Sequence, residues 1–323
     1  MRRRDFLTAV AATGAGAMLP MEASARAAPE RRTLVLVELR GGNDGLNTVV
    51  PYSSAAYYRL RPTLAVPHDE VLPLDAETAL HPALEPLLPL WAKGEVAIVQ
   101  GVRCAETGLS HFRAIEIWNT APASGEYLKE DWLSRALACR PMHAAARRVV
   151  DLCGVPDPSD DSVGALGPAL QAAARLIATD EPPAVVRLAL DGFDTHADQR
   201  DAHAALLAAF AQGLAAFRHT LRALGRWHST LIMTTSEFGR APQENAQRGT
   251  DHGTASVHFV LGGRVRGGLY GAPPDLSALR EDGQLPHFMD FRRLYASVLE
   301  RWWHMPSEVA LLGPHAPIEL LRA

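Results

Sequence analysis

Short apolar runs alternate with longer amphipathic stretches along most of the chain. Five runs rich in β-branched residues and leucine each predict a buried strand, at residues 33–39, 95–99, 185–190, 230–235 and 258–261. Helices are predicted at 79–93, 109–120 and 206–224, and further helices, less sharply placed, within 121–180. Strands that alternate with helices favour an α/β fold with a mainly parallel central sheet and helices on both faces.

Polar side chains gather where these predicted strands end. Those directly after a strand or in the next loop are Asn43, Asp44, Asp191, Asp194, His196, Glu237, Asp251 and His252. The carboxyl ends of parallel strands share one edge of a sheet, so residues far apart in the sequence can converge there. Carboxylates combined with imidazoles are typical ligands of Zn²⁺ or Mn²⁺, and carboxylates also bind Mg²⁺. We therefore predict a site for one or two divalent metal ions, with the ligands Asp44, Asp194, His196, Glu237, Asp251 and His252.

Each segment of this set also has a plainer interpretation. Residues 41–45 are turn-forming types, and Asp194 followed by a threonine could cap the next helix. Residues 251–253 could be a surface loop. His258 could be a core histidine or a ligand, and the sequence leaves open whether His252 or His258 binds the metal.

The N-terminal segment has the features of an export signal. Arg3 and Arg4 form a twin-arginine pair, residues 9–19 are small and apolar, and residues 23–27 offer small-residue cleavage sites. We expect a signal peptide at residues 1–27, recognised by the twin-arginine translocase, and a single domain at 31–323. The apolar segment is too short for a stable membrane span, so the mature protein is expected to be periplasmic or secreted. The alternative is a short amphipathic helix on a cytosolic protein.

Composition narrows the possible partners. A hydrophobic fraction of 47% suits an ordinary α/β enzyme, and a net charge of −4 without a basic stripe argues against nucleic acid. Cys104, Cys139 and Cys153 are an odd number of cysteines, so at least one thiol is unpaired within the chain. Pairing of Cys139 with Cys153 is left open.

Five motifs in order give the sequence a family resemblance. They lie at residues 39–48, 110–114, 192–196, 235–240 and 249–253, and a glycine-rich segment at 262–271 follows them. Together they resemble the family called domain of unknown function 1501, over residues 31–303. That family is placed in the alkaline phosphatase superfamily, beside sulfatases. The resemblance therefore implies an alkaline phosphatase-like, sulfatase-like fold with a metal-dependent transfer site.

The resemblance also implies roles for individual residues. Asp44 resembles the bridging carboxylate after the first strand, and Ser110 the nucleophile at a helix N-terminus. Asp194 and His196 resemble a ligand pair of the second half. The sequence departs from the superfamily at Glu237, which replaces an aspartate, and at Phe238, which replaces a metal-binding histidine. The pair at 251–252 would restore the missing ligand.

These observations lead to two hypotheses of function. The first is an exported metal-dependent hydrolase of phosphate or sulfate esters of small molecules or glycans. In it Ser110 attacks the ester and Arg113, one helical turn on, stabilises the equatorial oxygens, although Ser110 could equally be a plain helix cap and Arg113 a solvated surface residue. A formylglycine sulfatase is not expected, because neither Cys104 nor Cys139 begins the complete Cys-x-Pro-x-Arg motif. The second hypothesis is a non-catalytic periplasmic binding or assembly protein with a metal-stabilised fold, which the Phe238 departure favours.

Overall fold

The computed structural model describes residues 31–103, 110–123, 125–139, 147–153, 166–286 and 289–322. Residues 31–323 form one compact unit. The predicted signal peptide and Cys104 lie outside the described residues, whereas Cys139 and Cys153 are both free thiols. Within the described part of the chain, no helix is both long and apolar enough to cross a membrane.

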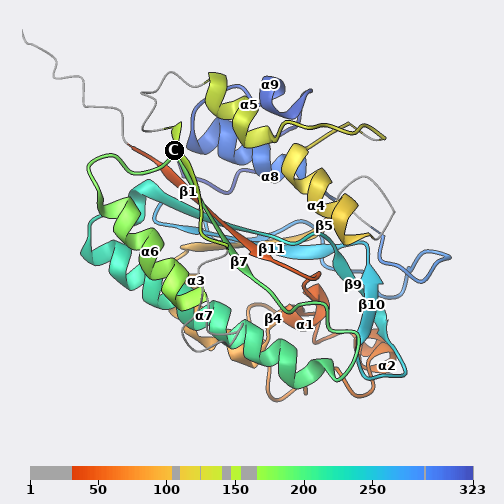
Figure 1. Ribbon diagram of the computed structural model, residues 1–323. Coiled ribbons are helices and arrows are strands. Elements are labelled where there is room, and N and C mark those ends of the chain that lie inside the picture. Colours follow the sequence, from red (N-terminus) through yellow and green to blue (C-terminus); the bar gives the residue numbers. More distant parts are fainter. Residues whose placement is uncertain are drawn as a thin grey trace, which may run out of the picture. The chain divides into compact units, whose positions relative to one another are not determined.

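A mainly parallel sheet forms the centre of the fold (Figure 1). Among the described residues it has eight strands in the order β12-β5-β11-β8-β1-β7-β6, with β13 pairing beside β5. Every pairing in it is parallel except those of β11, which runs antiparallel to β5 and β8. The strands are β1 (Thr33–Leu39), β5 (Val96–Arg103), β6 (Val149–Asp151), β7 (Val185–Leu190), β8 (Thr230–Thr235), β11 (Ser256–Gly262), β12 (Gly268–Tyr270) and β13 (Met289–Asp290).

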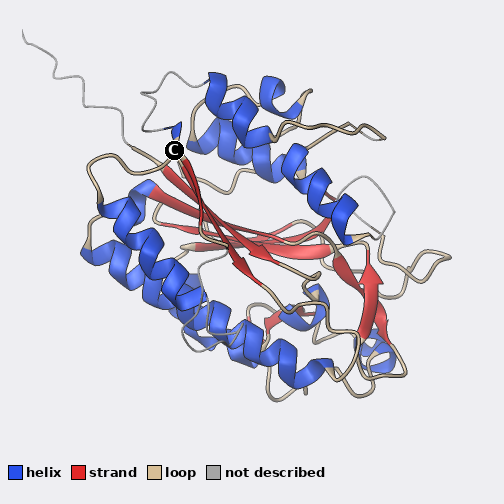
Figure 2. Cartoon of the chain, viewed as in Figure 1, coloured by secondary structure: helices blue, strands red, loops and turns tan. Residues whose placement is uncertain are grey.

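Helices cover both faces of this sheet (Figure 2). One layer contains α4 (His111–Thr120), α5 (Trp132–Cys139), α8 (Arg292–Ala296), the π-helical η4 (Ser297–Trp302) and α9 (Glu308–Leu311). The other contains the 3₁₀ helix η1 (Pro82–Leu87), α3 (Leu88–Ala92), α6 (Leu166–Ala178) and α7 (Gln199–Ala223). Successive side chains of a strand point to opposite faces of the sheet, so alternate residues of each strand pack in different cores. Leu34 and Leu36 of β1 pack in the first core, and Val35 and Val37 in the second. The predicted α/β fold class is thus confirmed.

Smaller elements complete the fold around one end of the main sheet. They are α1 (Gly45–Thr48), β2 (Val49–Val50), α2 (Ala55–Leu60), β3 (Leu72–Pro73), β4 (Ala79–Leu80), β9 (Gly239–Glu244) and β10 (Thr250–Gly253). A short 3₁₀ helix, η3 (Trp227–Ser229), directly precedes β8. β9 and β10 form an antiparallel pair in which His252 lies opposite Arg240. The register of this pair shifts between Thr250 and His252, and such irregularities re-aim side chains.

The five predicted strands are present, but one predicted helix is not continuous. Residues 79–93 contain β4, η1 and α3 in place of a single helix. Pro82, Pro86 and Pro89 explain the difference, because proline lacks an amide hydrogen and clashes with the preceding helical turn.

Candidate metal centre

Four side chains converge beyond the carboxyl ends of the central strands, and they come from one loop, one strand and one helix. Asp194 and His196 lie in the loop between β7 and α7, and His252 lies on β10. His111 is the first residue of α4. One ligand atom each from His111, Asp194 and His252 lie within 4.8 Å of one another.

Three ligand atoms at the centre form a nearly equilateral triangle. Nε2 of His196 lies 3.0 Å from Nε2 of His252 and 3.0 Å from Oδ1 of Asp194. Nε2 of His252 lies 3.2 Å from the same Oδ1. Ligand atoms around a tetrahedral zinc ion are roughly 3.3 Å apart, since each bond is about 2.0–2.1 Å long. The triangle therefore has dimensions that fit one divalent metal ion.

His111 lies beside the triangle and has a buried carboxylate behind it. Nε2 of His111 lies 3.5 Å from Oδ2 of Asp194, and Nδ1 lies 3.0 Å from Oε1 of Glu237. The same Oε1 accepts a hydrogen bond from the Gly41 amide at 2.8 Å. An ionised carboxylate can only accept, so it holds the proton on Nδ1 and leaves the Nε2 lone pair directed at the centre.

His196 has a similar arrangement with a more exposed carboxylate. Its Nδ1 lies 3.4 Å from Oδ1 of Asp251, while its Nε2 belongs to the triangle. The side-chain amide of Asn245 donates to Asp251 at 3.2 Å and to the carbonyl of His196 at 3.0 Å. Glu237 and Asp251, both predicted as ligands, thus stand behind imidazoles that could bind the metal directly.

A buried arginine fixes the carboxylate of the triangle. The Arg240 side chain is 0% exposed and donates to Oδ1 of Asp194 at 2.6 Å. Nη2, which makes this bond, also donates to the carbonyls of Gly41 and Phe193, while Nε donates to that of Gly42 and Nη1 to that of Thr250. Burial opposes ionisation of Asp194, but the hydrogen bond and charge of Arg240, together with His252 and His196, hold the pKa of this carboxyl below its usual value. Asp194 is therefore ionised at neutral pH.

Close backbone packing joins the loops of the centre. Gly41 has φ +113°, and a Cβ at this position would lie 2.3 Å from the Asp194 amide nitrogen. A Cβ at Gly249 would lie 2.2 Å from the carbonyl carbon of His196. Both contacts require the small size of glycine, and Gly41 also requires its backbone freedom. The glycines beside the predicted site residues therefore have a steric function.

The structure places Asp44 in a different environment from the other predicted ligands. Its fully buried carboxylate lies 2.6 Å from Nη1 of Arg61 and accepts from the Gln199 amide at 2.5 Å. Its Oδ1 also accepts from the Leu46 and Asn47 amides and caps α1. Burial opposes ionisation, but Arg61, His203 and Gln199 lower the pKa of Asp44 below its usual value. Arg61 balances its charge without a metal, and its assignment as a ligand stays a prediction.

The two predicted catalytic residues flank His111 along the chain. Ser110 is exposed at the N-cap position of α4, and its side chain makes no capping hydrogen bond. The Arg113 guanidinium contacts Glu116 at 3.0 Å, donates to the carbonyl of Glu126 at 2.7 Å and lies over the Tyr127 ring. Ser110 thus has a hydroxyl that does not cap α4 and belongs to the residue before His111, whereas Arg113 binds the loop that follows α4.

Sequence reasoning missed two residues of this centre. His111 lies in the motif at 110–114, directly after the serine in the cap position, and only its neighbours were assigned roles. Arg240 ends the motif at 235–240. Their presence within shared motifs was the available signal. His258 is fully buried against Trp118, outside the group, so the structure brings His252 and not His258 to the centre.

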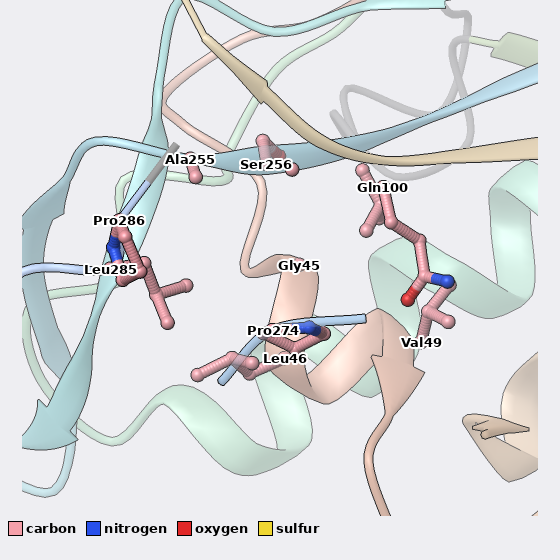
Figure 3. A pocket seen from close by; sticks show the side chains of 11 residues that line it. Gly45, Leu46, Val49, Gln100, Ala255, Ser256, Pro274, Leu285 and Pro286 are labelled. Carbon is pink, nitrogen blue, oxygen red and sulfur yellow. The ribbon is translucent and has the colours of Figure 1, made fainter. Parts of the chain in front are cut away.

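Two pockets lie near these elements. The first pocket, which has mainly apolar walls, is drawn in Figure 3. Its walls come from α1, the ends of β5 and β11, and residues 274 and 285–286; among the side chains drawn are those of Leu46, Val49, Gln100, Pro274 and Leu285. None of the predicted site residues lines it. A second pocket includes in its wall Glu237, the residue that lies behind His111.

Comparison with protein families identifies what the chain is. Residues 126–311 match the family described as "Protein of unknown function (DUF1501)". The chain belongs to this family. The match includes Asp194, His196, Glu237 and the pair at 251–252, whereas His111 precedes it. No curated protein matches this DUF1501 member.

Solved structures similar to this DUF1501 protein are distant in sequence. One is a lipoteichoic acid synthase from Listeria monocytogenes, with 10% identity and TM-score 0.39, covering 75% of this chain and 66% of that one. Another is a protein in the alkaline phosphatase superfamily from Vibrio parahaemolyticus, with 11% identity and TM-score 0.44, covering 89% and 71%. A third is the C-terminal periplasmic domain of an Escherichia coli protein in complex with Zn, with 11% identity and TM-score 0.40, covering 73% and 74%.

Proposed function

We propose that this DUF1501 protein is an exported, metal-dependent hydrolase of phosphate or sulfate esters of small molecules or glycans. The convergence of Asp194, His196 and His252 at one edge of the sheet, with His111 beside them, carries the proposal. Three imidazoles with one carboxylate suit Zn²⁺ or Mn²⁺. A divalent ion bound here would supply Lewis acidity for polarising the ester and neutralising developing charge.

The residues behind the ligands prepare them for this role. Oε1 of Glu237 lies 3.0 Å from Nδ1 of His111, and Oδ1 of Asp251 lies 3.4 Å from Nδ1 of His196, so the Nε2 atoms of both rings are left for the metal. Arg240 keeps Asp194 ionised and fixes its rotamer. These contacts exist within the protein itself, so the centre is organised before any ligand arrives.

We further propose Ser110 as the nucleophile. Its hydroxyl is exposed, is not used to cap α4 and belongs to the residue directly before His111. Oγ of Ser110 would lose its proton to solvent and form a bond to phosphorus or sulfur, while the bond to the leaving alcohol oxygen breaks and that oxygen takes up a proton from solvent. Water would then hydrolyse the seryl ester, which releases phosphate or sulfate and restores the hydroxyl. The partial positive charge at the N-terminus of α4 favours the anionic group that Ser110 attacks. Arg113, as a stabiliser of that group, would have to leave its present contacts with Glu116 and Glu126.

Metal content and turnover test the proposal together. Zinc and manganese per chain are measured for the wild type, for His252→Ala and for His219→Ala, a control that removes an exposed imidazole of α7. The purified proteins are then screened with phosphate monoesters, phosphate diesters and sulfate esters. We expect about one metal ion per chain and ester turnover in the wild type and the control, and loss of both in His252→Ala. Metal without turnover of any ester would favour the non-catalytic binding protein, and protein that binds no metal would refute the centre.

Export is tested separately by cell fractionation. The twin-arginine receptor reads guanidinium groups, so replacing Arg3 and Arg4 by lysine should leave the precursor in the cytoplasm. Undiminished mature protein outside the cytoplasm would contradict the twin-arginine route.

A further inference from the structure

The second pocket lies on the α4 side of the sheet, and charged side chains contribute to its lining. We call it the Arg187 pocket. It is lined by Leu36, Glu38, Arg40, Ile115, Trp118, Asn119, Trp132, Arg187, Thr235, Ser236, Glu237 and Tyr295. Strands β1, β7 and β8 form its floor, and helices α4, α5 and α8 form its walls. Apolar residues would be expected between a sheet and its covering helices, so each polar group here needs a partner.

Most of the charged groups in this pocket have such partners. Nε and Nη2 of Arg40 donate to Oε2 of Glu38 at 3.0 and 2.8 Å, so these two charges balance. Glu237 accepts from Gly41, and its Oε1 lies 3.0 Å from His111. The Trp118 indole donates to the backbone carbonyl of Glu237 at 3.1 Å, which ties the pocket wall to the residue behind the candidate centre.

Arg187 is the charged residue of this pocket whose buried donor lacks a hydrogen-bond partner within the described chain. It sits on β7 in register with Leu36 of β1, and its side chain is only 16% exposed. Nε of Arg187 is buried and has no hydrogen-bond partner within the described chain. The paired carboxylate is Asp131, and its Oδ2 lies 3.8 Å from Nη2, beyond hydrogen-bond distance. An unpaired buried donor on a cation is costly, and a ligand with acceptor oxygens would remove that cost.

We propose that the Arg187 pocket recognises a second anionic group on the substrate. Nε–H and the adjacent Nη of a guanidinium form a fork that matches two oxygens of a carboxylate, phosphate or sulfate. Glu237 lines the pocket and contacts His111 of the candidate centre, so the two sites are neighbours. A molecule that reaches both would place its ester at the centre and its second anionic group at Arg187. Ile115 and Trp118 provide apolar surface for the carbon skeleton between the two groups. The inference rests on the proposed function in calling this molecule the substrate, and names its class: an ester that bears a second negative charge.

Non-hydrolysable probes test this without turnover. Phosphonocarboxylates with two to six carbon atoms are titrated into zinc-loaded protein by calorimetry, alongside methylphosphonate, the matching diphosphonates and simple carboxylates. Trp118 and Trp132 line the pocket, so tryptophan fluorescence gives an independent signal of its occupation. We expect one chain length to bind about 10- to 100-fold more tightly than methylphosphonate, the range for one added charge-assisted contact. The comparison of carboxylates with diphosphonates shows which anion the fork prefers.

Substitutions of Arg187 decide whether the pocket is responsible. Arg187→Met should abolish the added affinity of the best probe while leaving methylphosphonate binding and metal content unchanged. Arg59→Met, which removes an exposed arginine of α2, is the matched control and should alter neither. Arg187→Lys keeps the charge without the fork and should recover only part of the affinity. It replaces the methionine variant as the test if that variant is unstable.

Two outcomes would overturn the proposal: equal affinity for methylphosphonate and for the probes with two anionic groups, or an equal loss of affinity for both in Arg187→Met. Arg187-dependent binding of carboxylates in protein that binds neither metal nor methylphosphonate would uphold the pocket and refute the proposed function.

Discussion

Two carboxylates stand behind imidazoles of the candidate centre, and their surroundings differ. The Glu237 side chain is only 4% exposed and interacts with both His111 and Gly41. Asp251 is 71% exposed and lies 3.4 Å from His196. Water and salt screen exposed charges strongly, whereas a buried carboxylate keeps its full effect on the ring beside it. Glu237 should therefore contribute more to metal affinity than Asp251.

Glu237→Gln isolates this charge at nearly constant size. We expect metal affinity to fall about 10- to 100-fold, the range observed when a carboxylate behind a ligating histidine is removed. Competition with a chelator of known affinity measures the change. Glu85→Gln, on the exposed surface of η1, is the control and should leave affinity unchanged. An unaltered affinity in Glu237→Gln would show that the contact with His111 does not tune a metal ligand.

Single residues also show where sequence reasoning reached its limit. Asp194, His196 and His252 could be selected because strand ends meet at one edge. Asp44 also follows a strand end. Its buried partner Arg61 lies 17 positions further along the chain, and no sequence pattern predicts that these two side chains pair. Glu237 could be placed near the centre, but its position behind His111 depends on where α4 packs. Side-chain partners across elements require three-dimensional packing, which periodicity does not encode.

At the scale of elements, α4 presents two adjacent residues with separate roles. Its first residue, His111, faces the candidate centre, and Ser110 occupies the cap position without a capping hydrogen bond. A lost cap usually costs about 1 kcal/mol. Because this cap bond is absent, the cost of removing the Ser110 hydroxyl should be smaller.

Ser110→Ala therefore separates catalysis from stability. We expect ester turnover to be lost, metal content to stay unchanged, and the free energy of unfolding to change by less than about 1 kcal/mol. Ser54→Ala is the matched control, because Ser54 also occupies a cap position without a capping bond, at α2. Turnover retained in Ser110→Ala would mean that a different group attacks the ester.

Elements differed in how well the sequence predicted them. Apolar runs located β1, β7 and β8 with the correct bounds, because a buried strand needs continuous apolar residues. The same signal found β11 but gave no direction, and this strand runs antiparallel. The helix predicted at 79–93 was wrong as a single element, because three prolines interrupt a regular helix there despite the apolar spacing.

The whole molecule contains buried histidines outside the candidate centre that link folding to pH. Burial lowers the pKa of His81, His203 and His258 to about 4 in each case. In the unfolded chain these imidazoles titrate near 6.5. Between about pH 6.5 and 4 the unfolded state therefore binds more protons than the native state, and stability falls as pH falls. The pKa of Asp44 is lowered as well, so its contribution persists in this window and is lost only in stronger acid.

His258→Phe tests this linkage at a site remote from the metal ligands. His258 is fully buried, and its ring packs against Trp118 at a centroid distance of 5.0 Å, so phenylalanine can replace it with little change in packing. The free energy of unfolding is measured by denaturant titration at several pH values, on chelated protein so that metal binding does not contribute. Between pH 6 and 4.5 the wild type should lose stability with a slope that the variant reduces by up to about 1.4 kcal/mol per pH unit, the effect of one proton. His219→Phe, at an exposed position of α7, should leave the slope unchanged. A slope unaffected by His258→Phe would mean that the buried imidazole becomes protonated without destabilising the fold.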